Sequence, residues 1–485
     1  MNDWGQGYVT DVDYTHGFYR DLAPGFLRLL CRLQGVAEPP GPLTYLELGC
    51  GQGFALNALA AANPDDRFVG VDFMPSQIVG ARRLAERAEL DNVTFLERSF
   101  DELVDRDDLP ACDIIVLHGV YSWVGPAQRE AIRKIILRHL KAGGLVYLSY
   151  NCMVGWAQFL PFQRLLRDLA VSRGGVEAAT ETFGRIRELA ATNIGYFADN
   201  AAIKALLTDL EKRDARYLAH EYLNGNWEPL YFHDVDRELR SCRLSFIGSA
   251  SPADNVPKFA AAPEAAALQQ SERDPALREL VKDIALGRRF RKDVYQRGPV
   301  RLDAGERGEA LADTVFALTK PRGSIPLKAP VPLGTLELRR PVYAAIFDAL
   351  DLGPRTLGAI AGGPDGLHEV VTVLMQTGAI HPCVAPGVAG GAAARLNRAI
   401  TETSEDRQRF GFVASPVIGT AIPVPAAMRS VLSICLSTPD LEDLEIAEQV
   451  KAAANREPVP DSENELSAAD IGQQRRSWRQ LGIIS

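Results

Sequence analysis

Three glycines at fixed spacing follow an acidic residue in the segment Tyr45-Leu-Glu-Leu-Gly-Cys-Gly-Gln-Gly53. The apolar run 43–48 predicts a buried strand and 55–62 predicts a helix, so the glycines lie in a strand-to-helix turn. Glycine lets the chain turn sharply and lets backbone N–H groups approach a ligand closely. Asp72 ends the next predicted strand, 68–72, where its carboxylate can accept hydrogen bonds from two ribose hydroxyls. Together these residues predict a site for an adenosine cofactor.

The glycine spacing distinguishes between adenosine cofactors. A dinucleotide fingerprint would need a third glycine at position 54, which is Phe, whereas this turn reads G-x-G-x-G. Glu47 would repel a pyrophosphate, but it suits the methionyl end of S-adenosylmethionine (SAM), whose amino group and sulfonium are positive. A glycine-rich turn alone would be a weak signal. Its combination with Glu47 and Asp72 predicts SAM, with these cofactor-binding residues: Glu47, Gly49, Cys50, Gly51, Gly53, Asp72 and Phe73.

SAM chemistry makes limited demands on acidic and basic side chains. Methyl transfer from a sulfonium is an in-line displacement with a neutral leaving group, so it depends mainly on alignment in a dry pocket. An amine acceptor such as lysine must first lose its proton. Burial lowers the pKa of an ammonium group, and aromatic faces attract the cation when it arrives. We therefore searched for aromatic and polar residues at the strand ends.

The best candidates follow the predicted strands 113–118 and 145–150. We predict that Tyr121 and Asn151 position the acceptor and that Trp123 or Trp156 forms a wall of its site. The two tryptophans could equally belong to the core, and Asn151 could simply cap the turn that it begins. His118 is a candidate general base, although a histidine at a strand end more often bonds locally. Its backbone carbonyl is the favoured partner of the SAM amino group.

The elements that position these residues alternate between strands and helices. Pro75 begins a predicted amphipathic helix over 75–89, and 93–97 is a predicted third strand. The strand at 113–118 is apolar throughout, as expected of a parallel sheet covered on both faces. This order predicts an open, doubly wound α/β sheet with its ligand outside the carboxyl ends of the strands.

Over residues ~40–150 the sequence resembles class I SAM-dependent methyltransferases. The glycine turn, Asp72, the segment Arg98-Ser-Phe100 and the turn Lys141-Ala-Gly-Gly144 occur in that family's order. The resemblance implies a Rossmann-like sheet and adds Ser99, Phe100 and His118 to the cofactor-binding residues. There is one departure: many members carry an Asp after the third strand that binds the adenine amino group. Here that place is Ser99, with Asp101 two residues further on.

A narrower resemblance rests on four segments, listed in chain order: His118-Gly-Val-Tyr-Ser-Trp-Val124, Tyr150-Asn-Cys-Met-Val-Gly-Trp156, His220-Glu-Tyr-Leu-Asn224 and Phe290-Arg-Lys-Asp293. These segments, together with Ala414-Ser-Pro-Val-Ile-Gly419, resemble bacterial methyltransferases with a methyltransferase-regulatory domain. Some relatives in that group are protein-lysine methyltransferases that modify outer-membrane protein. The resemblance thus implies a lysine acceptor and a possible homodimer. A small-molecule N- or O-methyltransferase and a non-catalytic SAM-binding regulatory protein stay open as alternatives.

Composition limits the remaining possibilities. The 485 residues carry a formal net charge of −9, which disfavours nucleic acid as a partner. The first residues lack the basic region and apolar core of a secretory signal, and prolines and a glycine interrupt the apolar stretch 413–428, so no membrane span is expected. Seven cysteines without a CxxC pair favour the cytoplasm over a disulfide framework. No metal-ligand spacing occurs among the histidines and cysteines, so we predict no metal site.

The chain is long enough for several domains. We predict a SAM-binding methyltransferase domain at 1–262, a middle helical or regulatory region at 263–330, a winged-helix-like unit at 331–385 and a C-terminal region at 386–485.

Within the first domain, the resemblance implies that an arm at 1–42, with Tyr8, Tyr14, His16 and Tyr19, closes over SAM and the acceptor. The alternative is a packing helix. A helical insertion at about 157–230 should cap the acceptor site, after which 244–248 should rejoin the sheet.

Two further expectations concern the second half. The basic run 288–292 is usually a solvated helix face, or else it docks an acidic partner or forms an interdomain ion-pair network. The proline-rich stretch 324–334 and the stretch 385–394 are predicted linkers.

Overall fold

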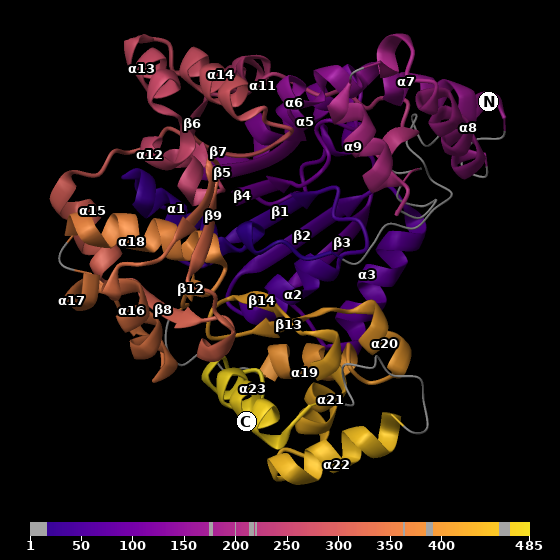
Figure 1. Cartoon of the computed structure of the whole chain (residues 1–485). Helices are drawn as coiled ribbons and strands as arrows, with labels where there is room; N and C mark the ends of the chain where they lie inside the picture. Colours follow the sequence, from indigo (N-terminus) through magenta and orange to yellow (C-terminus); the bar gives the residue numbers. More distant parts are fainter. Residues whose placement is uncertain are drawn as a thin grey trace.

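The computed structural model describes residues 17–173, 178–198, 200–212, 218, 221–361, 364–384, 391–454 and 466–485. A seven-stranded sheet in the order β3-β2-β1-β4-β5-β7-β6 lies at the centre of the molecule (Figure 1). Its strands are β1 Thr44–Leu48, β2 Arg67–Asp72, β3 Val93–Glu97, β4 Cys112–Leu117, β5 Leu140–Asn151, β6 Leu244–Ser249 and β7 Phe290–Arg297. The predicted doubly wound α/β fold is confirmed.

Alternation along the strands separates two hydrophobic cores. Tyr45, Phe68 and Ile114 belong to one core, whereas their neighbours Leu46 and Val69 belong to the other. The helices of the first core are α1 Pro24–Gln34, α2 Phe54–Ala62 and α3 Pro75–Arg87. Those of the second are α4 Phe100–Leu103, α5 Pro126–His139, α11 Phe232–Ser241 and α14 Pro275–Leu286. Since each buried strand contributes side chains to both cores, its sequence is apolar at nearly every position.

Strand β7 is the main departure from the sequence prediction. The basic run 288–292 is not a helix face: its residues from Phe290 onward form β7, which pairs antiparallel with both β5 and β6. The predicted strand at 244–248 does rejoin the sheet, as β6, but at the edge, beyond β7. The expected boundary at residue 262 thus falls between two strands of one sheet. The turn expected at 141–144 is likewise part of β5.

Buried charges fix β7 against α14. On one face of the strand, Arg291 bonds to Asp293 at 2.8 Å, to Asp283 at 2.6 Å and to Glu279 at 2.8 Å. Tyr150 of β5 donates to Asp293 at 2.8 Å. The Arg291 side chain is 2% exposed, and these carboxylates hold its pKa well above the ordinary value although burial opposes this. The basic run therefore forms an ion-pair network within the sheet domain.

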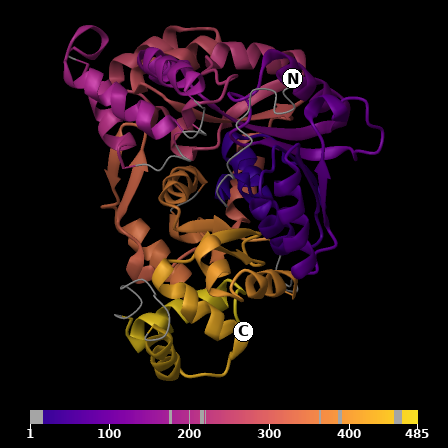
Figure 2. The ribbon, with the colours of Figure 1, turned by 90° about the vertical axis from the view of Figure 1, so that its right-hand side faces the viewer.

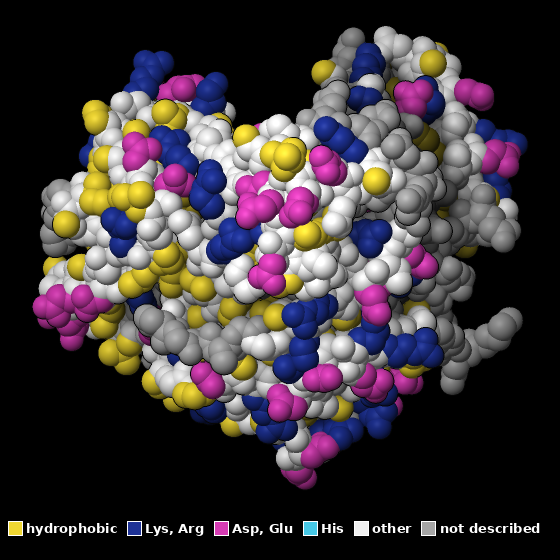
Figure 3. Space-filling view, turned by 90° about the horizontal axis from the view of Figure 1, so that it is seen from below, with side chains coloured by type: hydrophobic (Ala, Val, Ile, Leu, Met, Phe, Trp, Pro, Cys, Tyr) yellow, Lys and Arg dark blue, Asp and Glu magenta, His cyan; other side chains and the backbone are white. Residues whose placement is uncertain are grey.

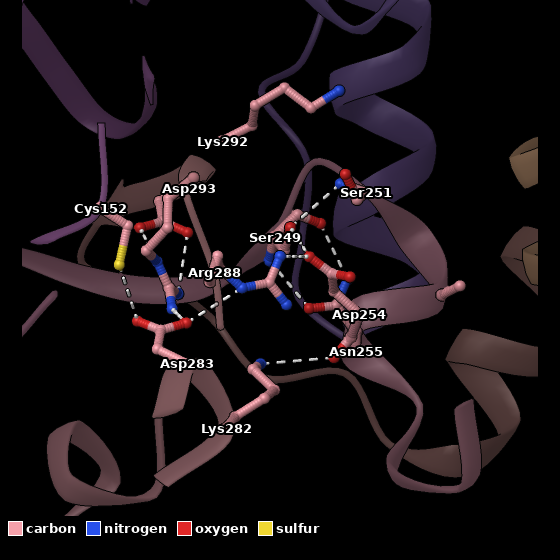
Figure 4. A network of polar contacts seen from close by, with 12 residues as sticks. Cys152, Ser249, Ser251, Asp254, Asn255, Lys282, Asp283, Arg288, Lys292 and Asp293 are labelled. Carbon is pink, nitrogen blue, oxygen red and sulfur yellow. Dashed lines mark hydrogen bonds and ion pairs between the residues drawn. The ribbon is translucent and has the colours of Figure 1, made fainter. Parts of the chain in front are cut away.

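The network extends through Arg288, which lies between Asp283 at 3.0 Å and Asp254 at 2.9 Å (Figure 4). Cys152 also contacts Asp283, with 3.7 Å between Sγ and Oδ2. Figure 4 shows the amino group of Lys292 pointing away from this cluster. It pairs instead with Asp21, 2.9 Å away, on the opposite face of β7. The two faces of one strand therefore have separate polar partners.

A helical cap follows β5, as predicted, and has its own apolar cluster. Its helices are α6 Met153–Trp156, η2 Ala157–Phe159, α7 Leu160–Ser172, α8 Ala179–Ala191, η3 Gly195–Phe197 and α9 Ala201–Leu210. In Figure 1 these magenta helices lie to one side of the sheet, above β3 and β4.

Residues 250–384 add a second, smaller sheet and several helices. The elements, in chain order, are η4 Pro252–Asn255, α12 Pro257–Ala260, α13 Pro263–Ser271, α15 Ala304–Ala312, β8 Val315–Leu318, η5 Arg322–Ser324, β9 Lys328–Val331, β10 Gly334–Glu337, α16 Pro341–Asp351, β11 Arg355–Thr356, α17 Gly358–Ala361, α18 Pro364–Thr377 and β12 Ile380–Pro382. Strands β11, β8 and β12 pair antiparallel beside α16 and α18. The stretch 324–334 is not an open linker, because β9 and β10 form a hairpin there.

The C-terminal part packs on the outer side of α2 and α3 (Figure 2). It contains α19 Gly391–Ala399, α20 Ser404–Arg409, β13 Phe412–Ser415, β14 Thr420–Pro423, η6 Ala426–Met428, α21 Arg429–Ser437, α22 Asp443–Ala454 and α23 Ala468–Gln480. Arg87 of α3 pairs with Asp406 at 2.9 Å, and the Asn63 amide donates to the Gly419 carbonyl at 2.9 Å. Of the expected second linker, 385–390 lie outside the described residues, and α19 begins at 391.

Four general features bear on the predictions. In the described part of the chain, no helix combines the length and apolar character needed to cross a membrane. All seven cysteines are free thiols. The same described residues contain no group of three or more His, Cys, Asp or Glu side chains suited to a metal ion. On the face seen in Figure 3, Lys and Arg side chains alternate with Asp and Glu.

The network around Arg291 predicts a large stability effect. Arg291→Met removes the cation that three carboxylates share, although Asp283 keeps Arg288 and Glu279 keeps Lys282. Breaking a buried ion pair from one side costs about 3–5 kcal/mol. Urea unfolding followed by tryptophan fluorescence should show this loss. The control Arg409→Met removes an exposed pair with Glu405 and should change the free energy of unfolding by less than ~1 kcal/mol. Equal effects of the two substitutions would contradict the assigned role of the network.

Candidate active site

The glycine turn lies between β1 and α2, as predicted, and leaves no room for side chains at two positions. Gly49 has φ +79°, and a Cβ there would be 2.5 Å from Cγ2 of Val120. Gly53 has φ +65°, and its Cβ would be 2.4 Å from that of Ala81. The amides of Gly49 and Cys50 donate to the Val71 carbonyl at 2.8 and 3.0 Å, which ties the turn to β2. The backbone is thus shaped for close approach of a ligand.

Asp72 links the loop that follows β1 to the loop that follows β2. Its Oδ2 accepts from the Gly51 amide at 2.9 Å, and its Oδ1 accepts from the Met74 amide at 3.0 Å. Burial raises the pKa of this carboxyl, and the backbone donors partly offset the effect. Each carboxylate oxygen keeps a further lone pair, so Asp72 can accept hydrogen bonds from a ligand in the cavity that it lines.

Glu47 is the residue best suited to a cation. Its side chain is buried, and its Oε2 has no hydrogen-bond partner among the described residues. Burial and the nearby Asp72 raise its pKa to about 8. A buried acceptor without a partner is costly, and a bound ammonium would supply the missing donor. The glycine cradle, Asp72 and this orphaned oxygen together fit the amino acid and ribose groups of SAM.

A single cavity of about 370 Å³ brings the predicted cofactor residues together. All ten line it: Glu47, Gly49, Cys50, Gly51, Gly53, Asp72, Phe73, Ser99, Phe100 and His118. Ser99 caps α4 through a reciprocal pair of bonds with Glu102, so its side chain already has a structural role. Gln77 and Arg98 line the same part of the cavity and were not predicted.

His118 lies at the end of a chain of polar contacts. Asp21 accepts from the Tyr147 hydroxyl at 2.9 Å, and Nδ1 of His118 is 3.0 Å from the same hydroxyl oxygen. The Tyr147 hydroxyl donates its one proton to Asp21, so its oxygen can only accept from His118. This contact assigns the tautomer of His118 with the proton on Nδ1. Burial lowers the pKa of His118 to about 4, leaving the ring neutral. Tyr19 lies against the ring, with 3.8 Å between centroids.

The predicted acceptor residues divide into two groups. Trp123 and Asn151 line the cavity, whereas Tyr121 does not. Tyr121 is fully buried, and its hydroxyl donates to Glu238 of α11. The prediction that Tyr121 positions the acceptor is therefore not supported by its placement. Trp156 also lies away from the cavity, with its ring 5.0 Å from that of Trp227, and belongs to the packed core.

Five further residues complete the wall on the acceptor side: Tyr19, Glu221, Asn224, Asn226 and Phe290. Phe290 pairs in register with Asn151, so both point to the cavity while their neighbours Arg291 and Tyr150 point to the ion-pair network. Glu221, Asn224 and Phe290 occur in the segments that carried the narrower resemblance. That resemblance was the one available signal for them. Of the N-terminal arm, Tyr8, Tyr14 and His16 lie outside the described residues.

This fold and this site define a SAM-dependent methyltransferase. The family model "Methyltransferase domain" matches residues 46–146, and "Predicted methyltransferase regulatory domain" matches 214–297. Over 440 residues the chain is 37% identical to the uncharacterized protein sll1526 of Synechocystis sp., covering 87% of this chain and 86% of that protein. The chain therefore belongs to the same family, the SAM-dependent methyltransferases with a methyltransferase regulatory domain.

Two other relatives come from Rickettsia. The uncharacterized protein RP789 of Rickettsia prowazekii is 28% identical over 310 residues, which cover 59% of this chain and 53% of that protein. The structure of PKMT2 from Rickettsia typhi in complex with AdoHcy has a TM-score of 0.69 and 18% identity, and covers 96% of this chain and 99% of that one. The whole architecture, including the C-terminal parts, is thus a known fold.

The raised pKa of Glu47 predicts pH-dependent cofactor binding. A ligand ammonium favours the carboxylate and lowers this pKa, so binding below pH 8 must release a proton. Affinity for S-adenosylhomocysteine should therefore rise with pH up to about 8, by at most about tenfold per unit. Calorimetry in buffers of different ionisation enthalpy measures the released proton. Glu47→Gln should bind more weakly and lose this part of the release; unchanged release would contradict the assignment.

Proposed function

We propose that this protein is a protein-lysine N-methyltransferase. The observation that carries the proposal is that aromatic rings and a carboxylate line the same cavity as the cofactor loops. The rings belong to Tyr19, Trp123 and Phe290, and the carboxylate to Glu221. Aromatic faces and a partly buried acid both attract an ammonium ion.

The chain's own residues account for the alignment that the reaction needs. Bound SAM supplies an electrophilic methyl group and leaves as a neutral thioether. The backbone of Asn151 is fixed on both sides, because its amide donates to Ser122 Oγ at 2.9 Å and its carbonyl accepts from Leu230 at 2.8 Å. Its side-chain amide can therefore orient an amine with little loss of freedom. Tyr19 also lines the cavity, with 3.8 Å between the centroids of its ring and the His118 ring.

The comparisons support a polypeptide acceptor. PKMT2 is a rickettsial protein-lysine methyltransferase, and its fold matches almost the whole of this chain, including the parts remote from the cofactor. Those parts offer additional surface for binding a polypeptide substrate. The division into domains, including a winged-helix-like unit at 331–385, and the homodimer both stay predictions. We also propose a cytoplasmic location, which the seven free thiols support.

A small amine is the second candidate acceptor. The cap segment that contributes Glu221, Asn224 and Asn226 closes one side of the cavity, and the volume of about 370 Å³ would suit a compact molecule. The acceptor must therefore be identified directly.

Incubation with isotopically labelled SAM and a lysate of the source cells identifies the acceptor. We expect label on lysine side chains of polypeptides, located by mass spectrometry of tryptic peptides. Asp72→Asn, which weakens the ribose contact, serves as the control and should lose the label. Label confined to small molecules would overturn the lysine proposal in favour of the small amine. Absence of any transfer despite measurable cofactor binding would contradict both.

A further inference from the structure

Glu221 occupies a distinctive place in the cavity. It lies in the segment that joins α9 to α11, and it lines the same cavity as Glu47 and Asp72. Its side chain is half-buried and lines the same cavity as Asn151 and Trp123. Among the residues that the structure describes, it has no ion-pair partner. It is thus a half-buried acid in the wall of the cavity.

Among the described residues that line the cavity with Glu221, the charged side chains are two acids, Glu47 and Asp72, and one cation, Arg98. The other titratable groups that line the cavity are Tyr19, Glu47, Cys50, Asp72, Arg98 and His118. Behind Tyr19 lie Asp21 and Lys292, which pair with each other at 2.9 Å. Glu221 is close enough to Tyr19 to raise the pKa of its hydroxyl, after burial and Asp21. Tyr19 and Glu221 therefore form one end of the acceptor site.

We propose that Glu221 is the general base that removes the proton from the acceptor ammonium before methyl transfer. The inference rests on the proposed lysine acceptor. The N–H bond of the ammonium breaks, its electron pair stays on nitrogen, and the proton passes to a carboxylate oxygen of Glu221. The neutral amine is then the nucleophile. The proton leaves Glu221 for solvent when the product departs, so the enzyme returns to its starting state.

His118 is the competing candidate, and its surroundings disfavour it. One face of its ring is covered by Tyr19, with 3.8 Å between the ring centroids. Burial lowers the pKa of His118 to about 4, so it is a weak base at neutral pH. Burial raises the pKa of Glu221 to about 7. A general base is most effective when its pKa lies near the working pH, because it is then both largely unprotonated and basic enough to take a proton. The lowered pKa of His118 and the raised pKa of Glu221 therefore both favour Glu221 as the base.

The position of Glu221 can be tested without an acceptor. Sinefungin is a SAM analogue with a carbon bearing an ammonium group where SAM has its methylated sulfur, and S-adenosylhomocysteine lacks that cation. We expect Glu221→Gln to weaken sinefungin about tenfold or more at pH 8 in calorimetry while leaving S-adenosylhomocysteine within about twofold. The control Glu181→Gln, on exposed α8 of the same cap, should change neither affinity. Equal affinities for wild type and Glu221→Gln would overturn the proposal.

The pH profile of methyl transfer tests the role of Glu221 as a base. With labelled SAM and lysate polypeptides, wild type should lose kcat/KM below an apparent pKa near 7, whereas Glu221→Gln should be about 100-fold slower at pH 7.5. Its rate should then rise up to tenfold per pH unit toward pH 9, as the free amine forms in solution. A uniform loss at every pH would overturn the base assignment. If wild type labels only small amines, the lysine proposal fails. The sinefungin experiment would still show whether Glu221 lies beside the position of the transferred methyl group.

Discussion

The buried guanidinium of Arg291 is the constraint on which the arrangement of the site depends. It holds β7 between β5 and α14 through Asp293, Asp283 and Glu279. Because side chains alternate along a strand, fixing Arg291 on one face fixes Phe290 and Lys292 on the other. Phe290 then lines the cavity beside Asn151, and Lys292 holds Asp21 beneath Tyr147 and His118. A buried ion-pair network thus positions the catalytic half of the molecule.

This arrangement gives the regulatory-domain segment a structural place. Residues 214–297 are not a separate appendage, because they supply β6 and β7 to the central sheet. They also contribute Glu221, Asn224, Asn226 and Phe290 to the cavity. The segment matched by "Methyltransferase domain" supplies the cofactor loops, and the regulatory segment supplies most of the opposite wall. Two matched stretches of sequence therefore meet in one sheet and contribute to the wall of one cavity.

The sequence was most informative where function is encoded locally. The glycine turn and Asp72 are specified by backbone geometry over a few residues, and every predicted cofactor residue lines the cavity. The acceptor side depends on contacts between distant segments. Tyr121 and Trp123 are two residues apart after β4, yet one bonds to α11 and the other faces the cavity, a difference that local pattern does not specify.

Strand β7 was missed for a related reason. Its sequence begins with a basic run, and neither its burial nor its carboxylate partners can be predicted without knowing that α14 packs beside it. The proline-rich stretch at 324–334 likewise forms a hairpin because neighbouring segments pack on it, overriding its local composition.

A crystal structure with S-adenosylhomocysteine would test the central claim most directly, because it places the reacting sulfur relative to both walls. We expect the amino group at Glu47, the ribose hydroxyls at Asp72, and the sulfur directed toward Asn151 and Glu221. A sulfur atom that faces away from the wall built by residues 221–226 and Phe290 would contradict the assignment of that wall to the methyl acceptor.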